Sequence, residues 1–250
     1  MKKRFGQHFL TDRSILRRIV QFAHIRPDDA VVEIGPGAGA LTEALAAAAH
    51  HVIAIEIDKD LIARLRAGMP ANVEIIEGDA LQADFPSGRF HLVGNLPYNV
   101  ATPLFKRFIE YRGRIIDATV TIQKEVAERL IAKPGSGDYG PLSVLLQYYA
   151  VITYGFTVPP GAFKPRPKVD SAVIRLEWKP NVTEAREFTD FVHQTFSSRR
   201  KKLVNNLLHL FPGVRREEVL HRMESAGIGM NARPQELSVA EFLRVYNQFR

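Results

Sequence analysis

The chain of 250 residues contains no cysteine. This excludes disulfide bonds, thiolate zinc sites, iron–sulfur clusters and cysteine nucleophiles, and it fits a reducing compartment. No apolar run approaches the ~20 residues that a membrane helix needs, and the basic start is not followed by the apolar segment of a signal peptide. We therefore expect a soluble, cytoplasmic protein with no membrane association.

Sequence patterns for metal binding and for serine hydrolysis are also missing. The histidines include an adjacent pair, His50-His51, but no His-Glu-x-x-His and no other metal-ligand spacing. Ser197-Ser198 lacks the flanking glycines of a nucleophile elbow. We predict no metal site, and we interpret these residues as structural.

Positive charge predominates, but it is unevenly distributed. The chain has 34 Lys and Arg against 27 Asp and Glu, a net charge of +7. Residues 31–100 carry nine acidic and four basic side chains, a net charge of −5, and the flanking segments are basic. A basic excess is typical of proteins that bind nucleic acid, because neutralised phosphates release counterions. A solvated basic surface that keeps the protein soluble is the alternative, and charge alone favours this alternative.

Short β-rich runs alternate with helical patterns up to residue 180. We expect strands over residues 30–34, 52–55, 73–76, 91–94, 118–122, 151–158 and 172–178. We expect helices over residues 12–24, 41–49, 59–67, 102–110, 126–131 and 142–149, the first with Asp12 as its N-cap. This alternation predicts an α/β fold with a seven-stranded, mainly parallel sheet. The last two strands have no helix between them, which predicts an antiparallel hairpin at the sheet edge.

The pattern changes after Pro180, where only helical periodicity is found. The expected helices cover residues 184–195, 199–210, 215–226 and 237–247, and Thr183 is the predicted N-cap of the first. We predict a catalytic α/β domain over residues 1–180 and a small helical domain over residues 181–250.

The first candidate site is a glycine-rich turn, Gly35-Pro36-Gly37-Ala38-Gly39, between an expected strand and an expected helix. Glycines there let a ligand approach the backbone closely. Glu56 ends the second expected strand, where a carboxylate can accept hydrogen bonds from ribose hydroxyls, and Asp79 follows the third. Together they favour a nucleoside cofactor. The spacing also matches the loose dinucleotide fingerprint, so NAD stays an alternative at this point.

The second candidate site is Asn95-Leu96-Pro97-Tyr98, directly after the fourth expected strand. An exocyclic amine on a base is a poor nucleophile, because its lone pair is delocalised into the ring. The Asn95 side-chain oxygen and the Leu96 carbonyl can accept hydrogen bonds from its two N–H groups, and Tyr98 can stack on the base. Positioning then supplies most of the rate, without a metal or a general base. The alternative is an ordinary turn between a strand and a helix.

These residues resemble the bacterial small-subunit ribosomal RNA adenine dimethyltransferases, and the resemblance covers nearly the whole chain. Its motifs are Gly6-Gln7-His8-Phe9-Leu10, Glu33-Ile34-Gly35-Pro36-Gly37-Ala38-Gly39, Gly94-Asn95-Leu96-Pro97-Tyr98, Gln123-Lys124-Glu125-Val126, Tyr139-Gly140-Pro141-Leu142-Ser143-Val144 and Phe163-Lys164-Pro165-Arg166-Pro167-Lys168-Val169-Asp170-Ser171. The resemblance implies a Rossmann-like methyltransferase fold, S-adenosylmethionine as cofactor, and transfer of four methyl groups to two adjacent adenines near the 3′ end of 16S rRNA, linked to ribosome biogenesis.

The resemblance also implies roles for single residues. His8 and Leu10 would help to enclose the cofactor, although position 8 is commonly Asn in that family. Within the glycine-rich turn that includes Gly37, Gly35 would pack against the methionine portion of the cofactor. Glu56 would hold its ribose, Asp79 would hold its adenine amine, and Asn95 would contact both cofactor and target.

Phe163 lies in a proline-rich loop between the last two expected strands. It can stack on the second face of a base presented to Tyr98, since enzymes that modify a base take it out of its stack. The alternative is a hydrophobic plug that anchors the loop. Lys164, Arg166 and Lys168 alongside it suit phosphate contacts, which favours the nucleic-acid role.

A second basic group is Arg199-Arg200-Lys201-Lys202, which we expect to open a helix. Four cations at a helix start oppose the macrodipole, so a polyanion would stabilise them, although a charge run is more often a solvated face. The resemblance implies contact with rRNA.

Three other functions compete with small-subunit methylation. One is a large-subunit (23S) rRNA adenine methyltransferase of the macrolide-resistance type, which shares the motif set. Another is a ribosome assembly factor that needs no turnover. The third, an NAD oxidoreductase, has no paired hydride-transfer residues in its favour. We expect the protein to act as a monomer.

Overall fold

The computed structural model describes residues 8–98, 100–180, 182, 186–198 and 201–250. Contacts divide the chain into two compact units. The first unit comprises Met1–Ala127 and Val151–Trp178, and the second comprises Glu128–Ala150 and Lys179–Arg250. The predicted boundary at residue 180 lies beside the end of the first unit, but residues 128–150 group with the C-terminal helices. The separate functions expected of two domains stay a prediction.

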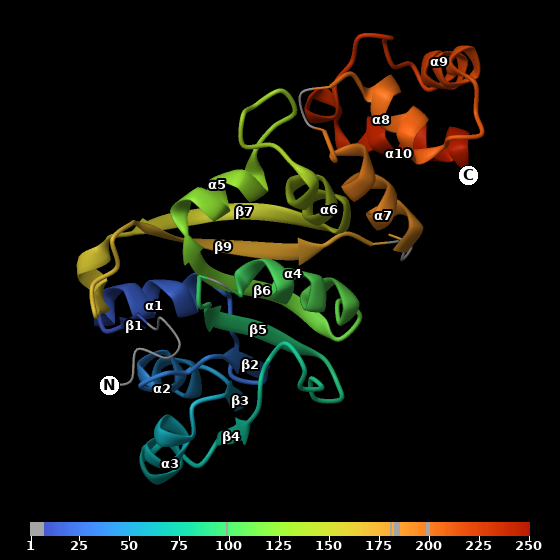
Figure 1. The fold of residues 1–250 in the computed structure, drawn as a ribbon. Coiled ribbons are helices and arrows are strands. Elements are labelled where there is room, and N and C mark those ends of the chain that lie inside the picture. Colours follow the sequence, from blue (N-terminus) through green and yellow to red (C-terminus); the bar gives the residue numbers. More distant parts are fainter. Residues whose placement is uncertain (1–7, 99, 181, 183–185, 199–200) are drawn as a thin grey trace. The chain divides into compact units, whose positions relative to one another are not determined.

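A seven-stranded sheet forms the centre of the first unit, with strand order β4-β3-β2-β5-β6-β9-β7 (Figure 1). The strands are β2 (Ala30–Ile34), β3 (His51–Glu56), β4 (Val73–Glu77), β5 (Phe90–Asn95), β6 (Ile115–Gln123), β7 (Ala150–Val158) and β9 (Ser171–Trp178). The neighbours from β4 to β6 pair in parallel, whereas β9 pairs antiparallel with β6. All seven predicted strands are confirmed, as is their mainly parallel arrangement. Figure 1 shows β7 running opposite to β9 at the edge, as the hairpin prediction requires.

The helices beside these strands follow the predicted periodicity. They are α1 (Arg13–Phe22), α2 (Ala40–Ala46), α3 (Lys59–Gly68), α4 (Ala101–Glu110) and α5 (Lys124–Ile131). Asp12 caps α1, and its side chain accepts hydrogen bonds from the backbone N–H groups of Ser14 and Ile15. The apolar positions of α1 are buried in a core cluster that also contains residues of β2, β3 and β5.

A two-stranded antiparallel ribbon in the first unit has no counterpart in the predictions. It joins β1 (Phe9–Leu10) to β8 (Phe163–Lys164), which follows the short 3₁₀ helix η1 (Pro160–Ala162). The backbone N–H of Thr11 extends the pairing, because it donates to the Ala162 carbonyl over 2.9 Å. We call residues 8–11 the N-terminal strap. It ties the start of the described chain to the loop between β7 and β9.

The second unit is built from helices around its own core. They are α6 (Pro141–Tyr149), α7 (Arg186–Thr195), α8 (Leu203–Leu210), α9 (Arg216–Ser225), α10 (Val239–Phe249) and the 3₁₀ helix η2 (Pro234–Glu236). Buried Phe188, Leu207, Met223 and Phe242 belong to one cluster that fills this unit. The predicted helical character is thus confirmed, while Thr183, the expected N-cap, lies outside the described residues. No helix in the described part of the chain is long and apolar enough to cross a membrane.

The predicted start of one helix is wrong. We expected a helix from residue 199, opened by four cations, but α8 begins at Leu203 with Lys202 as its N-cap. The backbone at Lys202 explains the difference. Its ψ of 145° is extended rather than helical, and the next N–H group, that of Leu203, donates to the Ala232 carbonyl over 2.8 Å. Lys201 and Lys202 therefore precede the helix.

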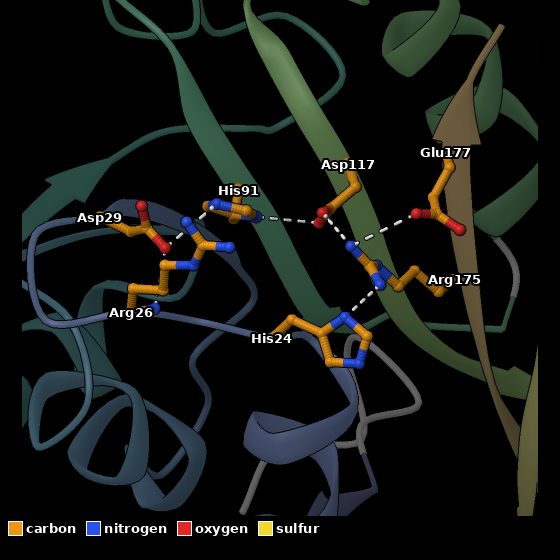
Figure 2. A network of polar contacts seen from close by, with 7 residues as sticks. All are labelled: His24, Arg26, Asp29, His91, Asp117, Arg175 and Glu177. Atoms are coloured by element: carbon orange, nitrogen blue, oxygen red, sulfur yellow. Dashed lines mark hydrogen bonds and ion pairs between the residues drawn. The ribbon is translucent and has the colours of Figure 1, made fainter.

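A buried polar network lies at the amino ends of the parallel strands, opposite the ends where α/β sheets bind ligands (Figure 2). His91 on β5 stands between two carboxylates, with its Nδ1 3.0 Å from Asp117 and its Nε2 3.3 Å from Asp29. Arg175 on β9 donates to Asp117 over 2.7 Å and to the ring of His24, just beyond α1. The network thus connects the end of α1 to three strands.

Asp117 depends on two neighbouring side chains, His91 and Arg175. Its side chain is almost fully buried, and burial alone would raise the pKa of Asp117. The hydrogen bonds from His91 and Arg175 outweigh burial and hold this pKa below its ordinary value. The carboxylate therefore favours folding above its unfolded pKa, near 3.8, and this contribution is lost as the pH falls through the lower folded value.

We predict that Arg175→Met lowers the free energy of unfolding by about 3 kcal/mol, because it leaves the buried Asp117 carboxylate without its closest cation. Urea denaturation at neutral pH measures this change. Lys59→Met is the matched control, since Lys59 pairs with Glu77 at 3.0 Å but is 81% exposed, and its loss should cost less than about 1 kcal/mol. Equal effects of the two substitutions would contradict the role given to the network.

Candidate active site

The glycine-rich turn joins β2 to α2 at the carboxyl end of the sheet. Gly35 and Gly37 adopt positive φ values of 67° and 59°, a region that L side chains rarely enter. A Cβ atom on Gly37 would lie 2.6 Å from the ring of Phe9, so the turn must contain glycine where the N-terminal strap crosses it. The predicted glycine turn is therefore formed, and the strap packs directly on it.

Glu56 lies at the end of β3, beside this turn, and is almost fully buried. Its Oε2 accepts a hydrogen bond from the Gly37 N–H over 3.1 Å. Its Oε1 accepts from the N–H groups of Ile57 and Asp58, both over 2.9 Å. Three backbone donors therefore hold the carboxylate in one orientation.

A cavity of about 260 Å³ opens between the ends of β2, β3 and β4. Its lining residues are Ile34, Gly35, Ile55, Glu56, Ile57, Gly78, Asp79, Ala80, Leu81, Pro97, Val100 and Leu104. Asp79 is half-buried, and its side chain accepts a hydrogen bond from the Leu81 N–H over 2.9 Å. The structure thus brings the predicted Gly35, Glu56 and Asp79 together. A mainly apolar cavity with two carboxylates suits a nucleoside, whose base is flat and whose ribose and exocyclic amine donate hydrogen bonds.

A smaller hollow of about 30 Å³ lies around the Asn95–Tyr98 motif. Its lining residues are His8, Phe9, Gly35, Gly37, Asn95, Leu96, Pro97 and Tyr98. The Asn95 side-chain amide donates to the His8 carbonyl over 2.8 Å. The hydroxyl groups of Tyr98 and Ser171 are 2.8 Å apart, and burial raises the pKa of Tyr98 despite this hydrogen bond. The predicted motif and the strap therefore form one site.

Phe163 lies in a different place from the one its predicted role requires. Its side chain is 2% exposed and packs in the core cluster of the first unit, which also contains Leu10, its partner in the β1–β8 ribbon. It does not line the hollow at Tyr98. In this conformation Phe163 is the hydrophobic plug considered as the alternative, and stacking on a base would require the strap to open. Leu10 is likewise buried rather than exposed to either cavity.

The predicted RNA-binding residues fall into two groups. Lys164 ends β8, and Arg166 and Lys168 lie on the loop between β8 and β9; all three side chains are exposed in the first unit. Lys201 and Lys202 are exposed in the second unit, and Lys202 Nζ donates to the Asn231 side chain over 2.7 Å. Arg199 and Arg200 lie outside the described residues. Within the described ranges, no group of three or more His, Asp or Glu side chains could hold a metal ion.

Glu33 lies close to Glu56 but lines neither cavity, and the sequence predictions gave it no role of its own. It lies on β2, two positions before Gly35, and is 1% exposed. No described residue hydrogen-bonds its Oε2, and burial, together with the nearby charge of Glu56, raises the pKa of Glu33 to about 8. A carboxyl group inside a strand that should be apolar was the signal that could have identified it.

We predict that Glu33→Gln changes how stability depends on pH. The pKa of Glu33 is raised from 4.5 to about 8 on folding, so between these values the folded chain holds a proton that the unfolded chain releases. Stability therefore falls as the pH rises through this window, by up to about 1.4 kcal/mol per pH unit. Glutamine keeps the shape of the side chain but cannot titrate.

Urea denaturation of the ligand-free protein between pH 5 and 9 tests this. The gain in stability of Glu33→Gln over the parent should grow with pH and level off above about pH 8. Glu43→Gln, at an exposed position on α2, is the control and should change little. Parallel curves for Glu33→Gln and the parent would show that Glu33 is not protonated in the folded state.

Comparison with known proteins gives consistent matches over the whole chain. The model of the family described as ribosomal RNA adenine dimethylase matches residues 1–250. A curated relative from Chromobacterium violaceum, named ribosomal RNA small subunit methyltransferase A, is 44% identical over 254 residues, which cover 98% of this chain and 94% of the relative. A relative of the same name from Pseudomonas aeruginosa is 40% identical and covers 99% of this chain and 94% of its own.

Solved structures agree with this likeness. A dimethyladenosine transferase from Plasmodium falciparum superimposes with a TM-score of 0.84 at 30% identity, covering 97% of each chain. The 23S rRNA methyltransferase ErmE superimposes with a TM-score of 0.74 at 32% identity, covering 96% of this chain and 98% of that one. The predicted methyltransferase fold is therefore confirmed.

Proposed function

The chain belongs to the family of ribosomal RNA adenine dimethylases, and from this membership we propose that it methylates adenine N6 in small-subunit rRNA with S-adenosylmethionine. The substrate is a pair of adjacent adenines near the 3′ end of 16S rRNA, each of which receives two methyl groups during ribosome biogenesis. The 40–44% identity to relatives named for the small subunit, against 32% to the 23S enzyme, favours this substrate over the large subunit.

One observation carries the proposal. The nucleoside-sized cavity and the hollow at Asn95–Tyr98 have two lining residues in common, Gly35 and Pro97. A cofactor in the first and a base in the second would therefore meet at a point where Gly35 adds no side chain between them. Bringing two reactants together in this way is itself a large source of rate.

The residues around the larger cavity fit S-adenosylmethionine. Glu56 can accept hydrogen bonds from both ribose hydroxyls, and Asp79 can accept one from the adenine amine of the cofactor. Gly35 leaves room for the methionine portion, and the N-terminal strap, which packs on Gly37, helps to enclose it. When bound, the cofactor supplies an electrophilic methyl group on a sulfonium.

The residues around the smaller hollow prepare the target amine. Oδ1 of Asn95 and the carbonyl oxygen of Leu96 can accept hydrogen bonds from the two N–H groups of the target amine. These two hydrogen bonds would direct the nitrogen lone pair at the methyl carbon. The nitrogen would bond to the methyl carbon as the carbon–sulfur bond breaks, which leaves a neutral thioether, and it would then lose one proton to solvent. Neither a metal nor a general base is needed for attack, because orientation supplies the effect.

We propose that the exposed Lys and Arg side chains bind the phosphates of the RNA. Lys164 at the end of β8, with Arg166 and Lys168 on the loop that follows, can neutralise phosphates near the target base. Lys201 and Lys202, with Arg199 and Arg200 from the segment outside the described residues, provide a second basic group on the helical unit. We further propose that the protein acts as a monomer in the cytoplasm.

We predict that the protein methylates unmethylated small ribosomal subunits from labelled S-adenosylmethionine and leaves large subunits unlabelled. Mass spectrometry should place dimethyladenine at two neighbouring positions of the small-subunit RNA. Asn95→Ala should lower the rate by about a hundredfold or more while subunit binding persists, because an acceptor of the target amine is lost. Asn247→Ala, at an exposed position on α10, is the control.

Each alternative has its own outcome in this experiment. Label in the large subunit would favour the resistance-type methyltransferase. Tight binding to small subunits without any label would favour a non-catalytic assembly factor, as would full assembly activity of Asn95→Ala in cells.

Phe163→Leu tests the stacking role separately from packing. Leucine keeps the buried apolar volume, so the free energy of unfolding should change by less than about 1.5 kcal/mol, whereas Phe163→Ala would leave a cavity that costs about 3–5 kcal/mol. If Phe163 stacks on the base, Phe163→Leu should lower turnover on RNA by about tenfold or more with the cofactor Kd unchanged. If Phe163→Leu turns over RNA as fast as the parent, Phe163 only packs in the core and does not stack on the base.

A further inference from the structure

The amide of Asn95 has a defined orientation in the structure. Its Nδ2 lies 2.8 Å from the His8 carbonyl oxygen. A carbonyl can only accept a hydrogen bond, so the atom that faces it must be the amide nitrogen. Oδ1 is consequently turned away from His8, and it has no hydrogen-bond partner within the part of the chain that the structure describes. An acceptor is thus left available beside the hollow.

His8 is itself held in place from two sides. Its Nδ1 lies 2.6 Å from the Pro165 carbonyl, so this nitrogen carries the hydrogen and donates. The pairing of β1 with β8 continues directly from His8, and Thr11 closes the other end of the strap on Ala162. The strap therefore sets the place of the His8 carbonyl, 87 residues away from Asn95 in the sequence.

The imidazole ring of His8 also lies against Tyr98. The two ring centroids are 5.7 Å apart and the ring planes are tilted by 30°. Tyr98 is fixed at its other end by its hydroxyl, which shares a hydrogen bond with Ser171. His8 thus contacts both side chains proposed to receive the base, Asn95 through its carbonyl and Tyr98 through its ring.

We infer that His8 is a positioning residue for methyl transfer: the strap holds its carbonyl so that Asn95 presents Oδ1, and not Nδ2, to the target amine. This inference rests on the proposed function and goes beyond it, because it assigns to His8 an action on the base-binding side of the site rather than enclosure of the cofactor. His8 acts through Asn95 and Tyr98 and not on the reacting atoms.

The physical reason is the near symmetry of an amide. Rotation by 180° about the last side-chain bond of Asn95 exchanges an acceptor for two donors in almost the same place. A donor pointed at the amine N–H groups would repel them and leave the lone pair misdirected. A fixed carbonyl on the other side selects the productive orientation before the base arrives, so no reorganisation is needed during the reaction.

His8→Ala and His8→Asn separate this role from a general loss of structure. Alanine removes the hydrogen bond to Pro165 and the contact with Tyr98. Asparagine restores a donor at the same number of bonds from Cα, since its amide nitrogen takes the place of Nδ1, but it restores no ring. His50→Ala is the matched control, because it removes an exposed imidazole from the same unit.

We expect His8→Ala to lower kcat on small subunits by about tenfold or more, with the KM for the subunit and the cofactor Kd, measured by titration, within about threefold of the parent. His8→Asn should recover kcat to within about threefold of the parent, and His50→Ala should match the parent. In NMR spectra of selectively ¹⁵N-labelled protein without ligands, the side-chain Nδ2 protons of Asn95 should exchange with solvent faster in His8→Ala than in the parent and in His8→Asn.

Several results would overturn the inference. An unchanged kcat in His8→Ala would do so, as would a loss confined to cofactor affinity, which would mean that His8 only encloses the cofactor. Failure of His8→Asn to recover kcat would show that the hydrogen bond to Pro165 is not what matters. If the parent methylated neither subunit, the proposed function would fail instead, and the amide exchange rates would still decide whether His8 orients Asn95.

Discussion

The position of β2 between β3 and β5 is the constraint on which the site depends. Parallel strands end at the same edge of a sheet, so the turn at Gly35 lies between Glu56 at the end of β3 and Asn95 at the end of β5. Neither neighbour is close in sequence. The order of the strands therefore brings the larger cavity and the hollow at Asn95–Tyr98 together at Gly35, which lines both and adds no side chain between them.

Backbone groups, rather than other side chains, orient Glu56, Asp79 and Asn95. Three N–H groups hold Glu56, and one carbonyl holds Asn95. Backbone atoms are placed by the fold as a whole, so they keep their directions when a ligand enters. Glu33 shows the contrast, because one of its oxygens has no hydrogen-bond partner among the described residues and burial raises its pKa to about 8. A buried carboxyl group is thus either supplied with donors or favoured in its protonated form.

The sequence predicted the sheet, most helices, the glycine turn and the Asn95–Tyr98 motif, because each has a periodicity or a local composition of its own. The β1–β8 ribbon was missed because its strands have two residues each and pair across more than 150 positions, so no local pattern announces them. Phe163 was expected to face a base for the same reason: without the ribbon, nothing showed that β1 buries it. The start of α8 was misplaced because the hydrogen bond from the Leu203 N–H to the Ala232 carbonyl, where the chain leaves the extended Lys202, joins residues far apart in the sequence and leaves no local signal.

Helix α1 runs from the carboxyl ends of the parallel strands to their amino ends, and different interactions hold the chain at each end of the helix. At its start the strap lies over the site at the carboxyl ends of the strands, held by hydrogen bonds to backbone carbonyls. Beyond its end, His24 joins the network of Arg175, Asp117 and His91 at the amino ends of the parallel strands (Figure 2). A buried charge that loses its partner lowers the free energy of unfolding, so the network at the amino ends governs the stability of the fold. The strap contributes mainly to the orientation of side chains in the site. The place of a residue along α1 and its neighbouring strands therefore indicates whether its loss should lower the stability of the fold or the rate of the reaction.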